Sequence, residues 1–121
     1  MKQLQLNHVA IHVRDVESSS RFYEDVLQLE RIPRPAFDFP GMWYRFGQDQ
    51  DLHLIGGRTA PVVSHHRGTH FAILVDDLDA WEKHVRGQGV ECFRKLRPDG
   101  ALQMYLTDPD GHVVELTQFV P

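Results

Sequence analysis

Two stretches of the chain carry the same pattern, His-x-Ala-Ile-x-Val-x-Asp followed by an apolar residue. The first begins at His8 and the second at His70, 62 positions later. The same step of 62 carries residues 52–54, Leu-His-Leu, onto residues 114–116, Val-Glu-Leu. Because the chain has 121 residues, two copies account for nearly all of it. A duplication of this length restricts the fold to two related halves.

Each half is expected to form a strand, a helix and three further strands. Residues 7–13 are rich in β-branched types and alternate along the chain, which predicts a half-buried strand. Asp15 and Asp77 stand where each can cap the helix that follows it. The later strands are expected near residues 28–32, 42–46 and 52–55 in one copy, and near 90–96, 101–107 and 113–118 in the other.

The two copies are expected to form one α+β domain built from two β-α-β-β-β modules. Module one spans residues 1–57 and module two spans residues 70–121. Residues 58–69, which contain Pro61 and Gly68, form the linker. A chain of this length buries roughly 65% of its unfolded surface and needs no covalent cross-links.

Composition excludes several classes of function. The formal net charge is −4, and the 13 Lys and Arg residues form no phosphate-binding footprint, so no nucleic-acid partner is expected. Cys92 is the single cysteine and cannot form an internal disulfide, which favours a reducing compartment. No apolar run approaches the ~20 residues that span a bilayer, and residues 1–6 lack the core of a signal peptide. We expect a soluble, cytoplasmic protein with no membrane partner.

Strand alternation places four metal-binding side chains at equivalent positions of the two copies. His8 and His70 begin the first strands, and His53 and Glu115 lie on the last strands, each opposite the apolar face. Three imidazoles and one carboxylate suit a divalent first-row metal, such as Zn, Ni, Mn or Fe. His12 shares this face and is a candidate substrate contact, although a lone histidine on a strand is more often hydrogen-bonded within the protein.

Three short motifs give the chain a family resemblance. They are Leu-Asn-His at residues 6–8, Arg-Phe-Tyr at 21–23 and Asp-Pro-Asp-Gly-His at 108–112, shortly before Glu115. Together they resemble the vicinal oxygen chelate superfamily. The resemblance implies sheets that curve into a cup around the metal, and a homodimer in which each site takes two ligands from each chain. It also implies that a small-molecule substrate chelates the metal through adjacent oxygens.

The family's individual activities fit this chain to different degrees. Glyoxalase I enzymes carry glutathione-binding Arg and Asn at the positions of His12 and Gly57. Fosfomycin transferases are similar at Tyr105 and residues 108–112, but have Thr where Ala10 stands. The leading hypothesis is a divalent-metal-dependent enzyme of glyoxalase type, a lyase, isomerase or transferase, acting on a small, oxygenated, anionic substrate.

Two functions other than the leading hypothesis stay open. The alternatives are a non-catalytic binding or resistance protein, and an iron-dependent extradiol-type dioxygenase using His8, His70 and Glu115. In the leading hypothesis Glu115 or His53 moves the proton.

The repeat also suggests substrate contacts. Tyr105 maps onto Trp43 by the step of 62, and both are expected to face the cup. Strand parity adds Arg45, which we expect to anchor the substrate's anionic group because its planar fork can donate two parallel hydrogen bonds. Arg94 is a further candidate contact. Residues 33–41, which carry two phenylalanines, form either a loop over the cup or a loop with its own small apolar cluster.

Overall fold

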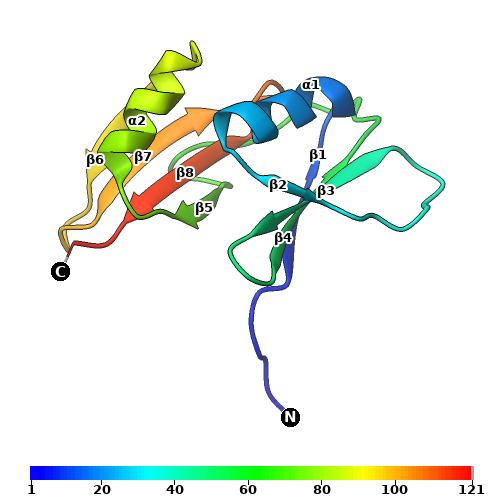
Figure 1. Cartoon of the computed structure of the whole chain (residues 1–121), viewed down its shortest axis with the longest axis horizontal. Helices are drawn as coiled ribbons and strands as arrows, with labels where there is room; N and C mark the ends of the chain where they lie inside the picture. Colours follow the sequence, from blue (N-terminus) through cyan, green and yellow to red (C-terminus); the bar gives the residue numbers. More distant parts are fainter. Residues whose placement is uncertain (121) are drawn as a thin grey trace.

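The computed structural model describes residues 1–120 (Figure 1). Within them neither helix is long and apolar enough to cross a membrane. The helices follow the aspartates expected to cap them: Asp15 accepts a bond from Glu17 N, and Asp77 accepts one from Ala80 N. The elements are β1 (His8–His12), α1 (Val16–Arg21), its π-helical continuation η1 (Phe22–Val26), β2 (Glu30–Ile32), β3 (Gly41–Phe46), β4 (Gln50–Ile55), β5 (Phe71–Leu74), α2 (Leu78–Gly87), β6 (Cys92–Leu96), β7 (Leu102–Thr107) and β8 (Val113–Gln118).

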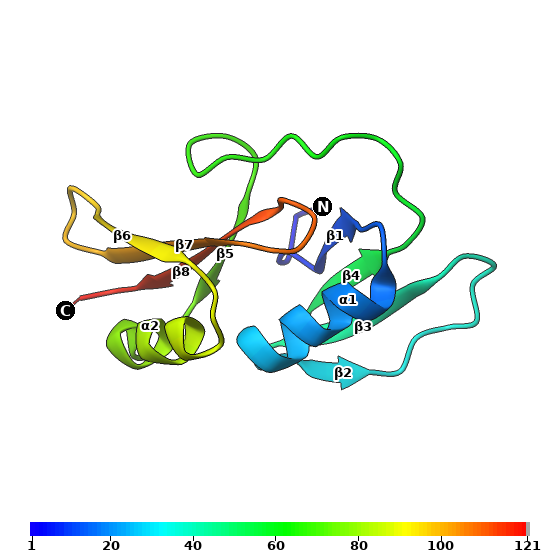
Figure 2. The same ribbon diagram turned by 90° about the horizontal axis from the view of Figure 1, so that it is seen from above.

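Each module forms its own four-stranded mixed sheet. The strand orders are β1-β4-β3-β2 and β5-β8-β7-β6, with only the first pair of each sheet parallel. The predicted α+β class and β-α-β-β-β plan are therefore confirmed. The two sheets lie beside each other and do not close into one cup within residues 1–120 (Figure 2). Strands β1 and β5 each leave one edge unpaired within the described chain.

The step of 62 is preserved in the pairing of the long strands. Trp43 pairs with His53, and its counterpart Tyr105 pairs with Glu115. The outermost strands depart from it. In module one Trp43 pairs with Ile32, so the repeat would pair Tyr105 with Arg94, but Tyr105 pairs with Phe93 instead. A shift of one residue moves a strand's side chains to the opposite face of the sheet.

Both helices cover the same side of the two sheets, where one apolar core runs through both modules (Figure 2). Leu52 and Leu54 of β4, and Val114 and Leu116 of β8, are completely or almost completely buried in it. Successive strand residues point to opposite faces of a sheet. His53, between Leu52 and Leu54, and Glu115, between Val114 and Leu116, therefore face away from the helices. The core thus fixes the orientation of the central site residues.

Buried polar bonds join the modules at the hairpin between β7 and β8. Tyr23 donates from its hydroxyl to Asp108 Oδ2 at 2.8 Å. Arg58 donates to Asp110 Oδ1 at 2.6 Å, and the backbone N–H of Arg14 donates to the same oxygen at 2.8 Å. Burial raises the pKa of Asp108 above its usual value, although several hydrogen bonds oppose this. These contacts hold the hairpin of module two against the first helix.

Candidate functional site

The four predicted metal ligands form two pairs, one on each module. In module one the rings of His8 and His53 stack with centroids 4.2 Å apart. In module two His70 Nε2 lies 3.0 Å from Glu115 Oε1. We call these the His8–His53 pair and the His70–Glu115 pair.

The two pairs do not meet within one chain. Among residues 1–120 no group of three or more His, Cys, Asp or Glu side chains is arranged to hold a metal ion. The four predicted donors therefore do not converge within a single chain over residues 1–120. The physical reason is that each pair belongs to its own sheet, and the two sheets share no strand.

Neighbouring oxygens fix the orientation of two of the histidine rings. His8 Nδ1 donates to Asn7 Oδ1 at 2.8 Å, and His70 Nδ1 donates to Gly68 O at 3.1 Å. The remaining nitrogen, Nε2, then carries the lone pair in each neutral ring. His70 Nε2 lies within hydrogen-bond distance, 3.0 Å, of a carboxylate oxygen of Glu115. Imidazole nitrogen and carboxylate oxygen are the donor types that a divalent first-row metal binds.

The His8–His53 pair is bordered by Trp43 and Asp51. The Trp43 and His53 rings stack at 3.9 Å, nearly parallel. Asp51 Oδ2 lies 3.4 Å from His53 Nε2, and Asp51 Oδ1 accepts a 2.7 Å bond from Arg45. Burial lowers the pKa of His53, with smaller contributions from the positive charges of His8 and Arg34, although Asp51 opposes the shift. A lowered pKa favours the neutral imidazole, the form that binds metals.

Arg45 faces the side of the sheet that parity predicted, but its guanidinium is already paired. Its partner Asp51 was not identified from the sequence, because the repeat places the apolar Val113 at the equivalent position. Only the register of β3 against β4, which sets Arg45 opposite Asp51, makes the pair visible.

The His70–Glu115 pair is enclosed by polar and aromatic side chains. Glu115 is 5% exposed and accepts a 3.0 Å bond from Gln103 Nε2. The buried Tyr105 ring lies edge-on to His70 with centroids 5.8 Å apart, and it stacks on Phe93 at 5.3 Å. Burial, and then the nearby Glu115 carboxylate, raise the pKa of Tyr105.

A lysine and a linker histidine complete this face of module two. Lys95 Nζ donates to His66 Nε2 at 3.1 Å, and the His66 ring lies 5.4 Å from that of Tyr105. His66 belongs to the linker, residues 58–69, and was not among the residues predicted for the site. Lys95 has no carboxylate partner in the described part of the chain. Its strand neighbour Gln103 is the residue that binds Glu115.

The structure contradicts Arg94 as a substrate contact. Arg94 donates to Asp79 Oδ1 at 2.5 Å and to Glu82 Oε1 at 3.1 Å, so it lies on the side of helix α2. It pairs across the sheet with the buried Met104, which confirms the orientation. The one-residue register shift of β6 explains why the repeat led to the opposite expectation.

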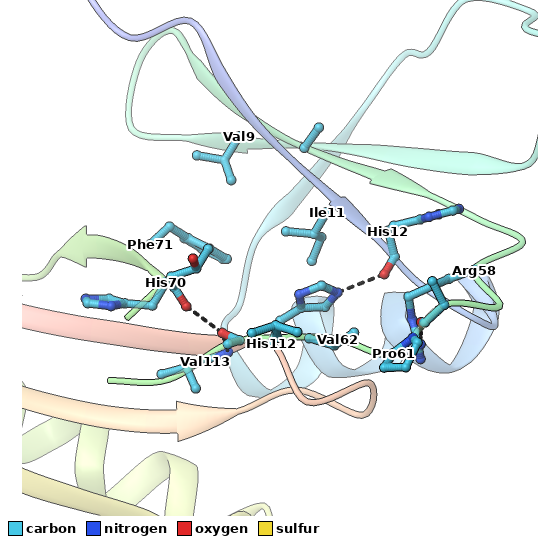
Figure 3. Close-up of a pocket in the computed structure, with 15 residues that line it drawn as sticks. Val9, Ile11, His12, Arg58, Pro61, Val62, His70, Phe71, His112 and Val113 are labelled. Carbon is cyan, nitrogen blue, oxygen red and sulfur yellow. Dashed lines mark hydrogen bonds between the residues drawn. The ribbon is translucent and has the colours of Figure 1, made fainter. Parts of the chain in front are cut away.

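His12 lies at a cavity of about 340 Å³ between β1, β5 and the linker. Its Nε2 donates to Gly56 O at 3.1 Å, and its carbonyl accepts a bond from His112 Nε2 at 2.8 Å (Figure 3). The predicted ligand His70 also lines this cavity, as do the apolar side chains of Val9 and Ile11. The cavity therefore lies at the edges of the two sheets that strands β1 and β5 form.

The chain matches the Glyoxalase/Bleomycin resistance protein/Dioxygenase superfamily over residues 5–116. It is 30% identical to metallothiol transferase FosB of Bacillus licheniformis, over 95% of this chain and 75% of that protein. It is 29% identical to Glyoxylase I 4 of Arabidopsis thaliana, over 92% of this chain and 68% of that protein. The structure of lactoylglutathione lyase from Agrobacterium tumefaciens superposes with a TM-score of 0.78 and 19% identity, covering 98% of this chain and 96% of that one.

The sequence match spans most of the chain, relatives carrying enzyme names align over nearly its whole length, and a solved glyoxalase-type structure shares its fold. The chain belongs to the vicinal oxygen chelate superfamily, described as the Glyoxalase/Bleomycin resistance protein/Dioxygenase superfamily.

Proposed function

We propose that this chain is a divalent-metal-dependent enzyme of glyoxalase type, acting as a homodimer on a small, oxygenated, anionic substrate. Each metal would take the His8–His53 pair from one chain and the His70–Glu115 pair from the other. The observation that carries the proposal is the presence of two donor pairs at repeat-equivalent positions that do not meet within one chain.

Unpaired strand edges support dimerisation. Strands β1 and β5 are edge strands, and each carries or adjoins a ligand of its module, His8 or His70. An unpaired edge is a ready surface for another chain. A partner that approaches these edges brings its own donor pair to the region where this chain's pair lies.

The donor chemistry supports a first-row metal. Imidazole nitrogen and carboxylate oxygen bind Zn, Ni, Mn and Fe. When bound, such an ion polarises adjacent substrate oxygens and stabilises the negative charge that develops on them. Glu115, which is held by Gln103, or His53, whose pKa burial lowers, would accept or return a proton at the substrate.

Lys95 is a better candidate than Arg45 for the residue that binds the substrate's anionic group. Arg45 is paired with Asp51, whereas within residues 1–120 the ammonium group of Lys95 hydrogen-bonds only to His66. Lys95 shares a sheet face with Gln103 and, through it, borders the His70–Glu115 pair. A cation without a carboxylate partner is free to bind a carboxylate or phosphonate.

The names of the relatives favour catalysis over sequestration. They include metallothiol transferases and lactoylglutathione lyases. The lactoylglutathione lyase of Haemophilus influenzae aligns over 95% of this chain. Transferase or lyase chemistry at a shared metal is therefore the function we propose, ahead of simple ligand binding or iron-dependent ring cleavage.

Mixed dimers test the shared site directly. His8→Ala and His70→Ala should each lower the metal content of the untagged protein sharply, measured by elemental analysis. A heterodimer of one His8→Ala chain and one His70→Ala chain keeps one intact shared site and should recover half the wild-type metal content. His65→Ala, which changes a histidine outside both pairs, is the control.

Each alternative gives a different result in this experiment. If each site lay within one chain, every chain of the mixed dimer would be defective and no metal would return. Unchanged metal content in the single variants, or a metal-bound monomer in sedimentation at micromolar concentration, would refute the shared site.

A further inference from the structure

The loop between β2 and β3 exposes two phenylalanine rings beside the module-one metal ligands. Phe37 is 45% exposed and Phe39 is 38% exposed. Their rings stack on each other with centroids 5.0 Å apart. Two adjacent apolar rings open to solvent mark a binding surface more strongly than a single one.

These rings continue into the predicted site without a gap. Phe37 lies 6.0 Å from Trp43, Trp43 stacks on His53 at 3.9 Å, and His53 stacks on His8 at 4.2 Å. We call Phe39, Phe37 and Trp43 the aromatic row. It connects the tip of the loop to both imidazoles of the His8–His53 pair.

Contacts of Arg34 and Gly41 hold the loop in place, and both of its phenylalanine rings stay partly exposed. The Arg34 guanidinium carbon lies 4.9 Å from the Phe37 ring centre and 5.0 Å from that of Phe39. The same guanidinium donates to Phe39 O at 2.8 Å. Where the loop rejoins the sheet, a Cβ on Gly41 would lie 2.4 Å from Leu54 O, so the backbones are in close contact. The loop that carries Phe37 and Phe39 is therefore anchored at Arg34 and at Gly41.

We propose that the aromatic row binds a planar aromatic group of the substrate while the substrate's adjacent oxygens chelate the metal that the His8–His53 pair would help to hold. This inference rests on the proposed function and specifies its substrate class as aryl-bearing chelating anions. The rings of the row are stacked or tilted against their neighbours. Their exposed faces and edges suit a flat aromatic partner, because aromatic pairs gain attraction from offset or edge-to-face contact beyond the area they bury. The other donor pair also has an aromatic border, formed by Tyr105 and the exposed Phe93.

Two chelators with the same oxygen pair test the proposal. Acetohydroxamate and benzohydroxamate both present adjacent oxygens, but one carries a methyl group and the other a phenyl ring. Titration calorimetry on the metal-loaded protein should show benzohydroxamate binding about tenfold more tightly, since two aromatic contacts supply a preference of that order. In Phe37→Ala/Phe39→Ala this preference should fall to about threefold or less. Metal content and acetohydroxamate affinity should not change.

Three controls separate the possible causes. Phe37→Leu/Phe39→Leu keeps apolar bulk without flat rings and should also lose most of the preference. Phe119→Ala removes an exposed ring that lies beyond β8 and should keep it. Sedimentation of each variant checks that the loop is not a subunit interface.

Every result decides the proposal. Equal affinity of the wild type for both chelators, a preference that survives the double variant, or dissociation of the double variant into monomers overturns the aryl site while leaving the metal site intact. A protein that holds no metal and binds neither chelator refutes the proposed function, and this inference with it.

Discussion

The ion pair between Arg58 and Asp110 provides the sharpest test of how the two modules are held together. Arg58 begins the linker, and Asp110 lies in the β7–β8 hairpin of module two. Their side chains are 8% and 6% exposed, and the Nη2–Oδ1 distance is 2.6 Å. Arg58→Met keeps much of the stem's bulk and removes the cation. The change leaves a buried carboxylate without its main partner.

The expected cost follows from the bonds that Asp110 keeps. Breaking a buried ion pair by removing one partner costs about 3–5 kcal/mol. Asp110 still accepts bonds from Arg14 N at 2.8 Å and from Ser19 Oγ at 3.2 Å, so the lower end of that range applies. We expect the free energy of unfolding to fall by about 3 kcal/mol, which lowers the urea midpoint by roughly 1.5 M.

The pH dependence of this loss gives a second measurement. Burial acts to raise the pKa of Asp110, but the bonds from Arg58, Arg14 and Ser19 outweigh it, and the pKa lies below its usual value. A carboxyl group with a lowered folded-state pKa stabilises the protein above its unfolded pKa of about 4, and this contribution is lost as the pH falls through the folded pKa. The stability difference between Arg58→Met and wild type should therefore shrink under acid conditions.

Urea unfolding at one fixed protein concentration measures both effects, because a dimer's stability depends on concentration. Arg97→Met is the matched control, since Arg97 pairs with Asp99 on the surface, where both side chains are more than a third exposed. That variant should lose less than about 0.5 kcal/mol. A loss below about 1 kcal/mol in Arg58→Met, or a difference from wild type that grows in acid, would refute the reasoning.

Three further predictions address the site and its support. Lys95→Met should weaken binding of an anionic ligand about ten- to hundredfold, with metal content unchanged. Arg45→Met should change that affinity less than about threefold in the same titration, because Asp51 already neutralises the charge of Arg45. Tyr23→Phe should cost about 1.5–2 kcal/mol in urea unfolding, because Asp108 loses a 2.8 Å bond; an unchanged midpoint would contradict that bond. Gly41→Ala should lower stability by about 1–3 kcal/mol, measured by thermal denaturation, because the new Cβ would lie 2.4 Å from Leu54 O.

The duplicated plan, and the strands on which the four predicted ligands lie, were predictable from the sequence alone. Alternation along a strand is a local property, so placing Leu52 and Leu54 in the core determines the face on which His53 lies. The repeat then relates His53 to Glu115 and His8 to His70 without any knowledge of the tertiary structure. The orientation of Arg45 toward the donor face also followed from this parity.

Other features depended on which residues oppose each other across strands and modules. The pairing of Arg45 with Asp51 and the placement of Arg94 beside helix α2 follow from strand register, and a shift of one residue reverses a face. The proximity of His66 to Lys95 follows from the path of the linker. The separation of the four donors into two pairs follows from the division into two sheets. Local alternation determines which way a side chain points, but only long-range packing determines what it meets there.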